Sequence, residues 1–484
     1  MNTKWFSIYV LMLSVGLFLR PDSARAQSKE ALEALVGPWV SIIGEEVGRT
    51  RAVFTLQLKE GELVGRSDAY TGNVKYPSLP LTDFELDLPR VRFTANPEAN
   101  IVFEGKLDPQ QGTLTGRLLY SDGSSLDIVL TKYSQARLAD EFPGLARLSQ
   151  PYAYQKPATT DDGWNVATLE EVGLDEAPLN EMMQNAYEGI YGQMHSILIA
   201  KDGHLVLEAY LDGYQADNVH PLHSVTKSIS SLLIGLAYDQ GKIASCDEKV
   251  FDFFPEHADL RTQAWDQITV KHLLTMSAGT HWDAASLANF HQESKDYRRT
   301  ALSKEPRYEP GEHWEYISPN VDLLAGVIKH ATGMHADRFA ATYLFEPLGI
   351  TRYDWDGLKQ DGYPLLDGSL AMRPRDMAKI GQLVLNKGTW KDKRILSEAW
   401  LEEATAHHMT VDETLSYGYL WWRTRSQTKP GLVGIFANGD GSQFILVLPE
   451  YNIVSVTTGS NYDNGMHMRP LMMLEEYLMK ASMR

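Results

Sequence analysis

Ser224 and Lys227 stand three residues apart at the start of a strongly apolar segment. On a helix, residues three apart share one face, so the two side chains would meet. A serine hydroxyl is a weak nucleophile at neutral pH, and a neighbouring amine that is neutral part of the time can take its proton. The spacing therefore points to nucleophilic chemistry, with Ser224 as the nucleophile and Lys227 as the base.

The segment around this pair is predicted to be a helix. Apolar residues recur in it with the spacing of one buried stripe, at Val225, Ile229, Leu232, Leu233, Leu236 and Ala237. Pro221 precedes the stripe and Gly241 follows it, as expected at the two ends of a helix. Ser224 is then expected in the first turn, where free N–H groups and the helix dipole favour developing negative charge.

A candidate second proton carrier, Tyr316, lies directly before another predicted helix. Ser318 is expected to cap this helix, Pro319 to take its first position and Gly333 to end it. A phenol on the loop before a helix can relay a proton between a serine, a lysine and a leaving group. An isolated S-x-x-K pair is a common pattern, so its combination with Tyr316 is what favours catalysis.

Together these segments resemble the serine β-lactamase and penicillin-recognising family, and in particular its class C-like branch with carboxylesterases and 6-aminohexanoate-dimer hydrolases. The resemblance covers about residues 166–480 and includes further segments in the family's order, at 268–279, 320–326, 372–378 and 417–422. It implies an α+β fold, with an antiparallel sheet flanked by helices and an all-helical subdomain. It also implies that Ser224, Lys227 and Tyr316 form the catalytic site.

The chain departs from the family pattern after the tyrosine and at the third motif. The family has an asparagine two residues after the tyrosine, whereas Ser318 stands there and Asn320 comes four residues after Tyr316. The Lys-Thr-Gly motif is absent, and the stretch 437–443 takes its place.

This stretch resembles the G-x-x-G-Q variant of the esterase and nylon-hydrolase relatives, with Ser442 in place of a glycine. The resemblance implies an oxyanion hole made by the main-chain N–H groups of Ser224 and Asp440. Substrate contacts are expected from Asn320, Gly441, Ser442, Gln443 and Trp421.

The favoured function is a serine hydrolase that cleaves an ester or amide through an acyl-enzyme, like a carboxylesterase or amidase. A D-Ala-D-Ala peptidase or β-lactamase is the alternative among enzymes, and a catalytically silent binding protein on the same fold is the alternative of another class. No cofactor or metal is expected, because the 14 histidines show no ligand spacing such as H-E-x-x-H. The G-x-S-x-G, G-x-G-x-x-G and Walker A patterns are also absent.

The N-terminus predicts a signal peptide over residues 1–26. Lys4 precedes an apolar run over 5–19, and Ala24-Arg25-Ala26 forms an A-x-A cleavage site. A run of about 15 residues is short for a membrane span, although an uncleaved anchor is the alternative. The protein is therefore expected to be periplasmic or secreted, without a membrane span after cleavage.

The net charge limits the classes of binding partner, and the cysteine content limits the disulfides that the chain can form. The formal net charge of −18 argues against nucleic acid or an anionic membrane, so a small-molecule or peptide ester or amide is the expected partner. Cys246 is the only cysteine, which excludes an internal disulfide.

Residues 27–133 are predicted to form a separate β-rich accessory domain. Alternating apolar and polar residues between turn residues predict strands, at 54–59, 91–94, 101–107, 114–120 and 126–130. The pattern G-x-L-x-G occurs at 61–65 and at 112–116, which indicates two similar hairpins. Short antiparallel strands of this kind favour a lipocalin-like barrel or a sandwich, and a small barrel can enclose an apolar ligand.

The proline-containing segment 134–165 is expected to be a linker, followed by the hydrolase domain over 166–484. A hairpin with an Asp202-Gly203 turn is expected near the start of this domain. A helix over about 470–483 is expected at its end.

Overall fold

The computed structural model describes residues 32–43, 50–59, 61–71, 74–75, 79–97, 99–134, 137, 152–212, 214–288, 290, 294, 296–355, 362–425, 432–462 and 465–482. The signal peptide predicted over 1–26 lies outside the described residues, as does half of the predicted linker. The chain divides into two compact units. The first contains Arg51–Ser67 and Pro80–Tyr133, and the second contains Ser134–Arg484.

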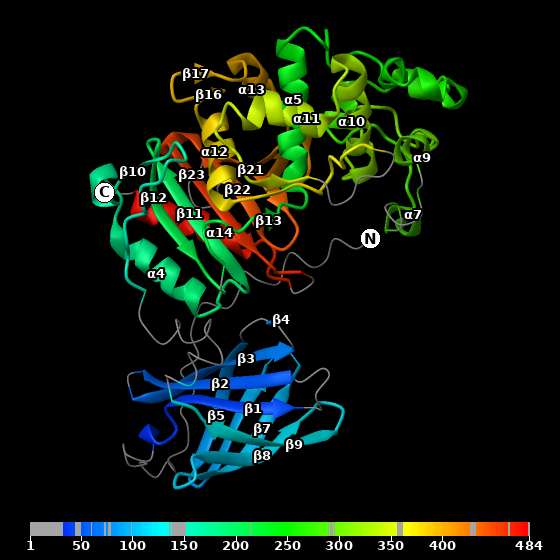
Figure 1. The fold of residues 1–484 in the computed structure, drawn as a ribbon. Helices are drawn as coiled ribbons and strands as arrows, with labels where there is room; N and C mark the ends of the chain where they lie inside the picture. Colours follow the sequence, from blue (N-terminus) through cyan, green and yellow to red (C-terminus); the bar gives the residue numbers. More distant parts are fainter. Residues whose placement is uncertain are drawn as a thin grey trace. The chain divides into compact units, whose positions relative to one another are not determined.

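The first unit is a closed antiparallel barrel (Figure 1). Its strands are β1 (Gly37–Ile43), β2 (Thr50–Lys59), β3 (Glu62–Thr71), β5 (Leu79–Asp87), β6 (Arg90–Asn96), β7 (Ile101–Asp108), β8 (Thr113–Leu119) and β9 (Ser125–Lys132), with the short β4 (Val74–Lys75) beside β3. The strand order is β2-β1-β9-β8-β7-β6-β5-β3-β4, and a further pairing of β2 with β3 closes the ring. Of the two predicted architectures, the first unit is therefore the barrel and not the sandwich.

Aromatic side chains of the barrel itself fill its interior. The ring of Phe93 lies 5.6 Å from that of Phe54, 5.5 Å from that of Phe84 and 5.0 Å from that of Phe103, measured between centroids. Trp39 is fully buried in the same core. These rings give the unit a hydrophobic core of its own.

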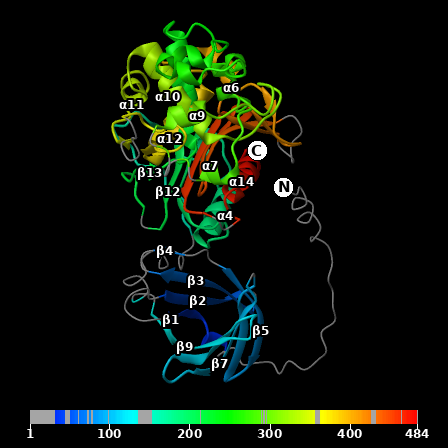
Figure 2. The ribbon, with the colours of Figure 1, turned by 90° about the vertical axis from the view of Figure 1, so that its right-hand side faces the viewer.

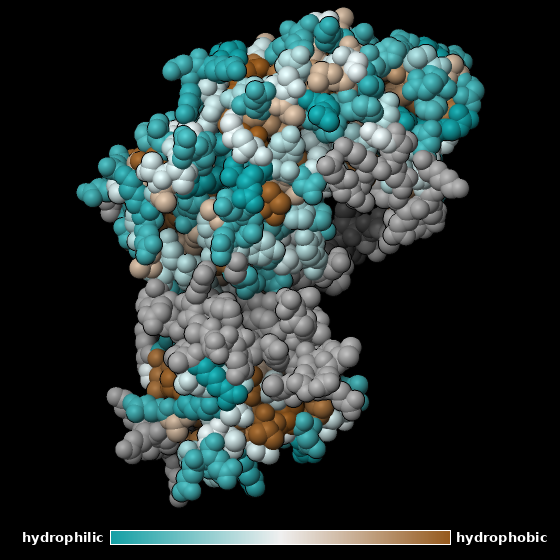
Figure 3. Space-filling view, in the orientation of Figure 1, coloured by the Kyte–Doolittle hydropathy of each residue, from teal (hydrophilic) through white to brown (hydrophobic). Residues whose placement is uncertain are grey.

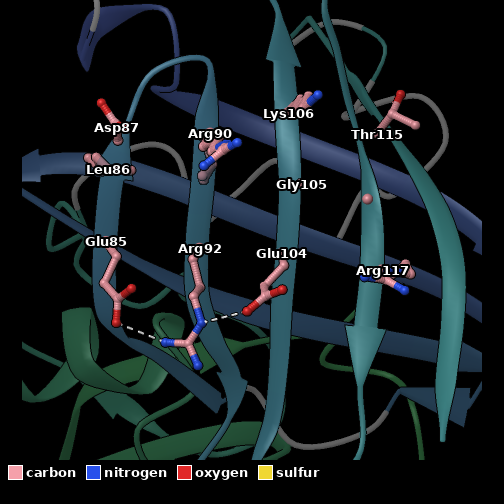
Figure 4. Close-up of a pocket in the computed structure, with 12 residues that line it drawn as sticks. Glu85, Leu86, Asp87, Arg90, Arg92, Glu104, Gly105, Lys106, Thr115 and Arg117 are labelled. Atoms are coloured by element: carbon pink, nitrogen blue, oxygen red, sulfur yellow. Dashed lines mark hydrogen bonds and ion pairs between the residues drawn. The ribbon is translucent and has the colours of Figure 1, made fainter.

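The outer face of β5–β8 carries a charged concavity of about 640 Å³ (Figure 4). Arg92 donates to Glu85 and to Glu104, each at 2.9 Å. Arg90 and Lys106 stand directly opposite each other on β6 and β7. None of the residues predicted to take part in catalysis lines this concavity.

The second unit is built on a sheet of nine strands in the order β10-β12-β11-β23-β22-β21-β20-β19-β18. Their bounds are β10 Asn165–Val166, β11 Met194–Lys201, β12 His204–Tyr210, β18 Met409–Thr410, β19 Leu415–Tyr417, β20 Trp422–Arg425, β21 Val433–Gly439, β22 Gln443–Leu448 and β23 Ile453–Gly459. All neighbours pair antiparallel except β10 and β12, which are parallel.

Helices cover both faces of this sheet (Figures 1 and 2). One face packs against α4 (Glu176–Tyr187) and α14 (Arg469–Ala481), which share a hydrophobic core with alternate residues of β11, β22 and β23. The other face packs against α5 (Val225–Asp239) and α12 (Pro374–Leu385).

Further helices of the second unit gather around one that packs against α5 (Figures 1 and 2). They are α6 (Val270–Leu274), α9 (Tyr297–Leu302), α10 (Ser318–Thr332) and α11 (Ala336–Ala340), with α13 (Glu398–Ala404) against α5 on another side. A second, small sheet orders β13 (His220–Pro221), β15 (Ala371–Met372) and β14 (Tyr353–Asp354). The expected α+β architecture is confirmed.

The hairpin predicted from the Asp202-Gly203 pair is present in the structure. The hairpin β11–β12 turns at Asp202 and Gly203, both with positive φ (50° and 78°), the geometry that favours an Asp-Gly pair.

In the described part of the chain, no helix combines the length and the apolar composition that crossing a bilayer requires. The visible face of the second unit is largely hydrophilic (Figure 3).

Candidate active site

Ser224 lies at the N-terminal end of the central helix α5 (Val225–Asp239). The preceding residue, His223, has a φ of +47°, a left-handed conformation that is costly for a residue with a Cβ. This turn places the serine at the helix mouth, where main-chain N–H groups point outward. The apolar stripe predicted from the sequence is buried along its whole length.

Lys227 lies one helical turn further on, next to the serine. Its Nζ is 2.9 Å from Ser224 Oγ and 2.5 Å from the main-chain oxygen of Asp367. The side chain is only 1% exposed. A buried amine in contact with a serine hydroxyl is the arrangement that nucleophile activation requires.

Tyr316 lies beside the lysine. Lys227 Nζ is 5.1 Å from the centroid of the tyrosine ring. Trp422 stacks on that ring at 5.8 Å between centroids, and Tyr417 contacts it edge-on at 6.4 Å. The aromatic neighbours hold the phenol beside the amine.

The helix after Tyr316 begins one residue earlier than expected. Ile317 is the N-cap of α10 (Ser318–Thr332), Ser318 is its first residue, and Gly333 ends it in a left-handed conformation. The prediction of Ser318 as the cap is therefore wrong by one position, because the extended residue is Ile317 (φ −114°, ψ 97°). The position of Tyr316 directly before the helix is unaffected.

The hairpin of β21 and β22 reaches the nucleophile. A Cβ added to Gly439, the last residue of β21, would overlap the carbonyl oxygen of Leu222 and lie 3.1 Å from the main-chain nitrogen of Val225. Such a close approach is possible only for glycine. It brings Asp440, the next residue, to the edge of the site at Ser224.

Buried side chains fix the turn of this hairpin. Gln443 donates to the carbonyl oxygens of Asp440 (2.9 Å) and Gly459 (2.8 Å) and accepts from the N–H of Gly459 (3.1 Å). Ser442 Oγ donates to the carbonyl oxygen of His467 (2.8 Å). Gly441 has a φ of +79° and donates its N–H to the Asp440 carboxylate at 2.9 Å.

Histidines and a tyrosine surround the Asp440 carboxylate. His223 Nε2 is 3.0 Å from the hydroxyl of Tyr462, and His467 Nδ1 is 3.9 Å from Asp440 Oδ1. Burial lowers the pKa of both histidines, and the Asp440 charge only partly opposes this. Both imidazoles are therefore neutral at pH 7 and place no positive charge beside Asp440.

Three of the side chains predicted to contact substrate are buried in the framework. Asn320 exchanges hydrogen bonds with Thr280 (2.9 and 3.1 Å) and is 2% exposed. Ser442 and Gln443 are fully buried in the turn contacts given above. These three side chains therefore support the backbone of the site and are not exposed toward a substrate.

Trp421 is fully buried in the hydrophobic core. Its neighbour Trp422 is partly exposed and stacks on Tyr316. Successive strand residues point to opposite faces, so an aromatic pair in the sequence does not indicate which ring meets the site. The structure makes Trp422 the aromatic candidate.

Sequence reasoning missed two aspartates behind the lysine. The carbonyl of Asp367 holds Lys227, and the buried carboxyl of Asp322 on α10 binds the N–H groups of Leu366 and Asp367 (2.8 and 3.1 Å). An aspartate in the apolar stripe of a helix was a usable signal, because such residues are rarely buried without a partner. Within the described ranges, no group of three or more His, Cys, Asp or Glu residues could hold a metal ion.

Known proteins resemble the second unit. A family model described as Beta-lactamase matches residues 181–469. The 6-aminohexanoate-dimer hydrolase of Paenarthrobacter ureafaciens is 27% identical over 259 residues, 48% of this chain and 64% of that protein. A putative D-alanyl-D-alanine carboxypeptidase of Salmonella enteritidis is 24% identical over 228 residues, 41% of this chain and 51% of that protein. The chain thus spans between half and two thirds of the length of these curated relatives.

The fold has solved counterparts as well. A putative beta-lactamase from Bacteroides dorei superimposes with a TM-score of 0.55 and 19% identity, over 64% of this chain and 100% of that chain. At this identity the likeness shows the fold, while the family match covers more than half of the sequence. The chain therefore belongs to the Beta-lactamase family, a family of serine hydrolases.

Proposed function

We propose that this protein is an exported serine hydrolase that cleaves an ester or amide through an acyl-enzyme on Ser224. The observation that carries the proposal is the buried Lys227 amine, 2.9 Å from Ser224 Oγ and beside the ring of Tyr316. A nucleophile with an adjacent base and a second proton carrier is the minimal equipment for acyl transfer.

In the proposed reaction, Ser224 Oγ attacks the substrate carbonyl carbon while its proton passes to Lys227. The negative charge that forms on the carbonyl oxygen is stabilised by the main-chain N–H groups of Ser224 and Asp440. The close approach of Gly439 to Leu222 and Val225 supports this pairing, because it brings the Asp440 peptide to the helix mouth.

The bond to the leaving alcohol or amine then breaks, and Tyr316 supplies the proton that the leaving group needs. Water attacks the ester formed on Ser224 in the second half of the reaction, with the same two side chains moving its proton. The acid is released and Ser224 regains its hydrogen, so no cofactor is consumed.

Carboxylesterase or amidase activity is preferred over β-lactam hydrolysis for an electrostatic reason. In the stretch that replaces Lys-Thr-Gly, Asp440 is acidic and no cation stands beside it in the sequence. A carboxylate on a substrate would meet repulsion at this rim. We propose export on the basis of the predicted leader, and an accessory role for the barrel unit.

Mass spectrometry of the intact protein after exposure to a fluorophosphonate, and separately to penicillin, tests the proposal. We expect a stable adduct on Ser224 with the fluorophosphonate, accompanied by loss of esterase activity. A stable penicilloyl adduct or rapid penicillin turnover would favour a D-Ala-D-Ala peptidase or a β-lactamase, respectively. Absence of both adducts would favour a silent binding protein.

A further inference from the structure

A turn over residues 365–370 connects the two helices of the site. On the side of α5, the carbonyl oxygen of Leu370 accepts from the N–H of Leu222 at 2.8 Å. Ser230 Oγ of the same helix donates to the carbonyl oxygen of Leu366 at 3.1 Å. The turn is therefore anchored directly to the segment that carries the nucleophile.

On the side of α10, Asp322 anchors the turn. One carboxyl oxygen, Oδ1, accepts from the N–H of Leu366 (2.8 Å) and from that of Asp367 (3.1 Å). The Asp322 side chain lies in the protein interior, with the residue only 4% exposed. Asp367 in turn offers its carbonyl oxygen to Lys227 Nζ at 2.5 Å. A single carboxyl group thus fixes the two peptide groups that precede the lysine's carbonyl partner.

The direction of this last hydrogen bond has a chemical consequence. A carbonyl oxygen can only accept, so one N–H of Lys227 points at Asp367. The remaining positions on the nitrogen are then restricted in orientation. Ser224 Oγ lies 2.9 Å from the same nitrogen, within reach for the proton transfer that the proposed function requires.

We infer that Asp322 is a positioning residue for this reaction: by holding the turn at Leu366 and Asp367, it orients Lys227 to take the proton of Ser224. The inference rests on the proposed function and adds to it a residue that touches neither substrate nor nucleophile. Small displacements of a reacting group carry a large cost in rate, so loss of this anchor slows acylation.

The protonation of Asp322 agrees with a role in positioning. Burial and the neighbouring Asp367 carboxylate raise the pKa of Asp322 well above its usual range. This direction favours the neutral carboxyl group, so the two hydrogen bonds from the main-chain N–H groups, and not a charge, carry the proposed role. Asparagine has the same shape as this neutral group and keeps the acceptor oxygen.

Asp322→Ala and Asp322→Asn separate the hydrogen bonds from the charge. We expect Asp322→Ala to reduce kcat for p-nitrophenyl butyrate, and the rate of fluorophosphonate labelling at Ser224, by roughly 100-fold or more. KM should change by less than about threefold, because the substrate contacts remain. Asp322→Asn should restore both rates to within about fivefold of wild type.

Ser369→Ala is the matched control. Ser369 Oγ donates to the carbonyl oxygen of Leu365 at 2.9 Å, so the variant removes a hydrogen bond of the same turn that Asp322 does not make. Its kinetics should match those of wild type. Circular dichroism and thermal unfolding check that every variant is folded.

Two results would overturn the inference. Acylation by Asp322→Ala within about fivefold of wild type would mean that the turn needs no anchor. Equal losses in Asp322→Ala and Asp322→Asn would mean that the ionisable proton matters and the hydrogen bonds do not. If Asp322→Ala does not fold, Asp322→Asn alone decides: fast acylation supports positioning and slow acylation contradicts it. Wild-type protein that is not labelled at Ser224 would instead refute the proposed function.

Discussion

The amine of Lys227 lies over the ring of Tyr316, with Nζ 5.1 Å from the ring centroid. The two residues come from the starts of different helices, α5 and α10, which pack against each other. This contact brings the S-x-x-K pair and the tyrosine together at the site proposed for proton transfer.

Ser224→Ala should abolish turnover while the fold remains intact. Loss of a nucleophile commonly lowers kcat by several orders of magnitude, and here it also removes the site of fluorophosphonate labelling. The measurement is kcat for p-nitrophenyl butyrate together with intact-protein mass spectrometry. Ser231→Ala on the same helix is the control, because the buried Ser231 hydroxyl has no hydrogen-bond partner in the described part of the chain. Activity of Ser224→Ala within about tenfold of wild type would exclude this serine as nucleophile.

Tyr316→Phe should bind substrate normally and acylate slowly. The ring contacts with Trp422 and Tyr417 persist in phenylalanine, whereas the hydroxyl that carries a proton is lost. General acid–base groups are worth roughly 10²–10⁴-fold in rate. Single-turnover kinetics measure acylation separately from binding.

Tyr308→Phe serves as the control for that variant. Tyr308 is exposed and packs on His313, so its hydroxyl should not matter for acylation. If Tyr316→Phe acylates as fast as wild type, another group must move the proton.

Gly439→Ala should lose activity through a steric clash at the nucleophile. Its new Cβ would overlap the Leu222 carbonyl oxygen, so either β21 or the turn before Ser224 must move. The control is Gly434→Ala on the same strand, where the closest neighbour would be a side-chain methyl group, that of Thr424 at 3.0 Å, and not a main-chain atom. We expect kcat/KM to fall at least about tenfold further in Gly439→Ala than in Gly434→Ala. Equal activities of the two variants would contradict the close approach.

Activated short-chain esters should be far better substrates than nitrocefin. The Asp440 carboxylate stands at the rim, and its neighbours His223 and His467 have lowered pKa values and stay neutral at pH 7. The carboxylate of a β-lactam therefore meets an acidic side chain with no cationic histidine beside it. The test is kcat/KM for p-nitrophenyl butyrate and for nitrocefin at one pH. Equal or faster turnover of nitrocefin would place β-lactam hydrolysis first.

The stability of the protein should decrease as the pH falls below neutrality, partly because of His220. Burial lowers the pKa of this histidine in the folded protein, so the unfolded chain takes up a proton near pH 6.5 that the folded chain does not. Since stability rises with pH wherever the unfolded state binds more protons, the contribution of His220 is present above its unfolded pKa and is lost as the pH falls toward its folded pKa.

His220→Gln should flatten this dependence. One proton corresponds to at most about 1.4 kcal/mol per pH unit, which urea unfolding between pH 5.5 and 7.5 can measure. His223 and His467 should leave a remaining slope, because burial lowers their pKa values too. Identical slopes for wild type and His220→Gln would show that His220 contributes nothing in this range.

The sequence predicted the elements whose signals are local. The apolar stripe after Ser224 and the closing Gly241 gave α5 almost to the residue, and the Asp202-Gly203 turn gave the hairpin β11–β12. Strands β1, β4 and β5 of the barrel were missed, and β3 was indicated only by the hairpin pattern at 61–65. In β5, the alternation of apolar and polar residues is interrupted at Asp83, which has a positive φ (52°) and lies in a register shift.

The sequence alone pointed to Ser224, Lys227 and Tyr316, which the structure brings together. These three were identifiable because residue type and helix start are local properties. Which tryptophan meets the site was not, since the choice between Trp421 and Trp422 depends on which face of the strand turns toward Tyr316.

Only the tertiary structure showed which distant segments contact Lys227 and the start of α5. Asp322, the turn at Asp367 and the hairpin at Gly439 meet α5 through contacts between segments distant in sequence. Such contacts depend on how whole elements pack, and no local periodicity encodes them. The sequence by itself thus determined which residue types are available for the proposed chemistry, whereas packing decided which groups surround them.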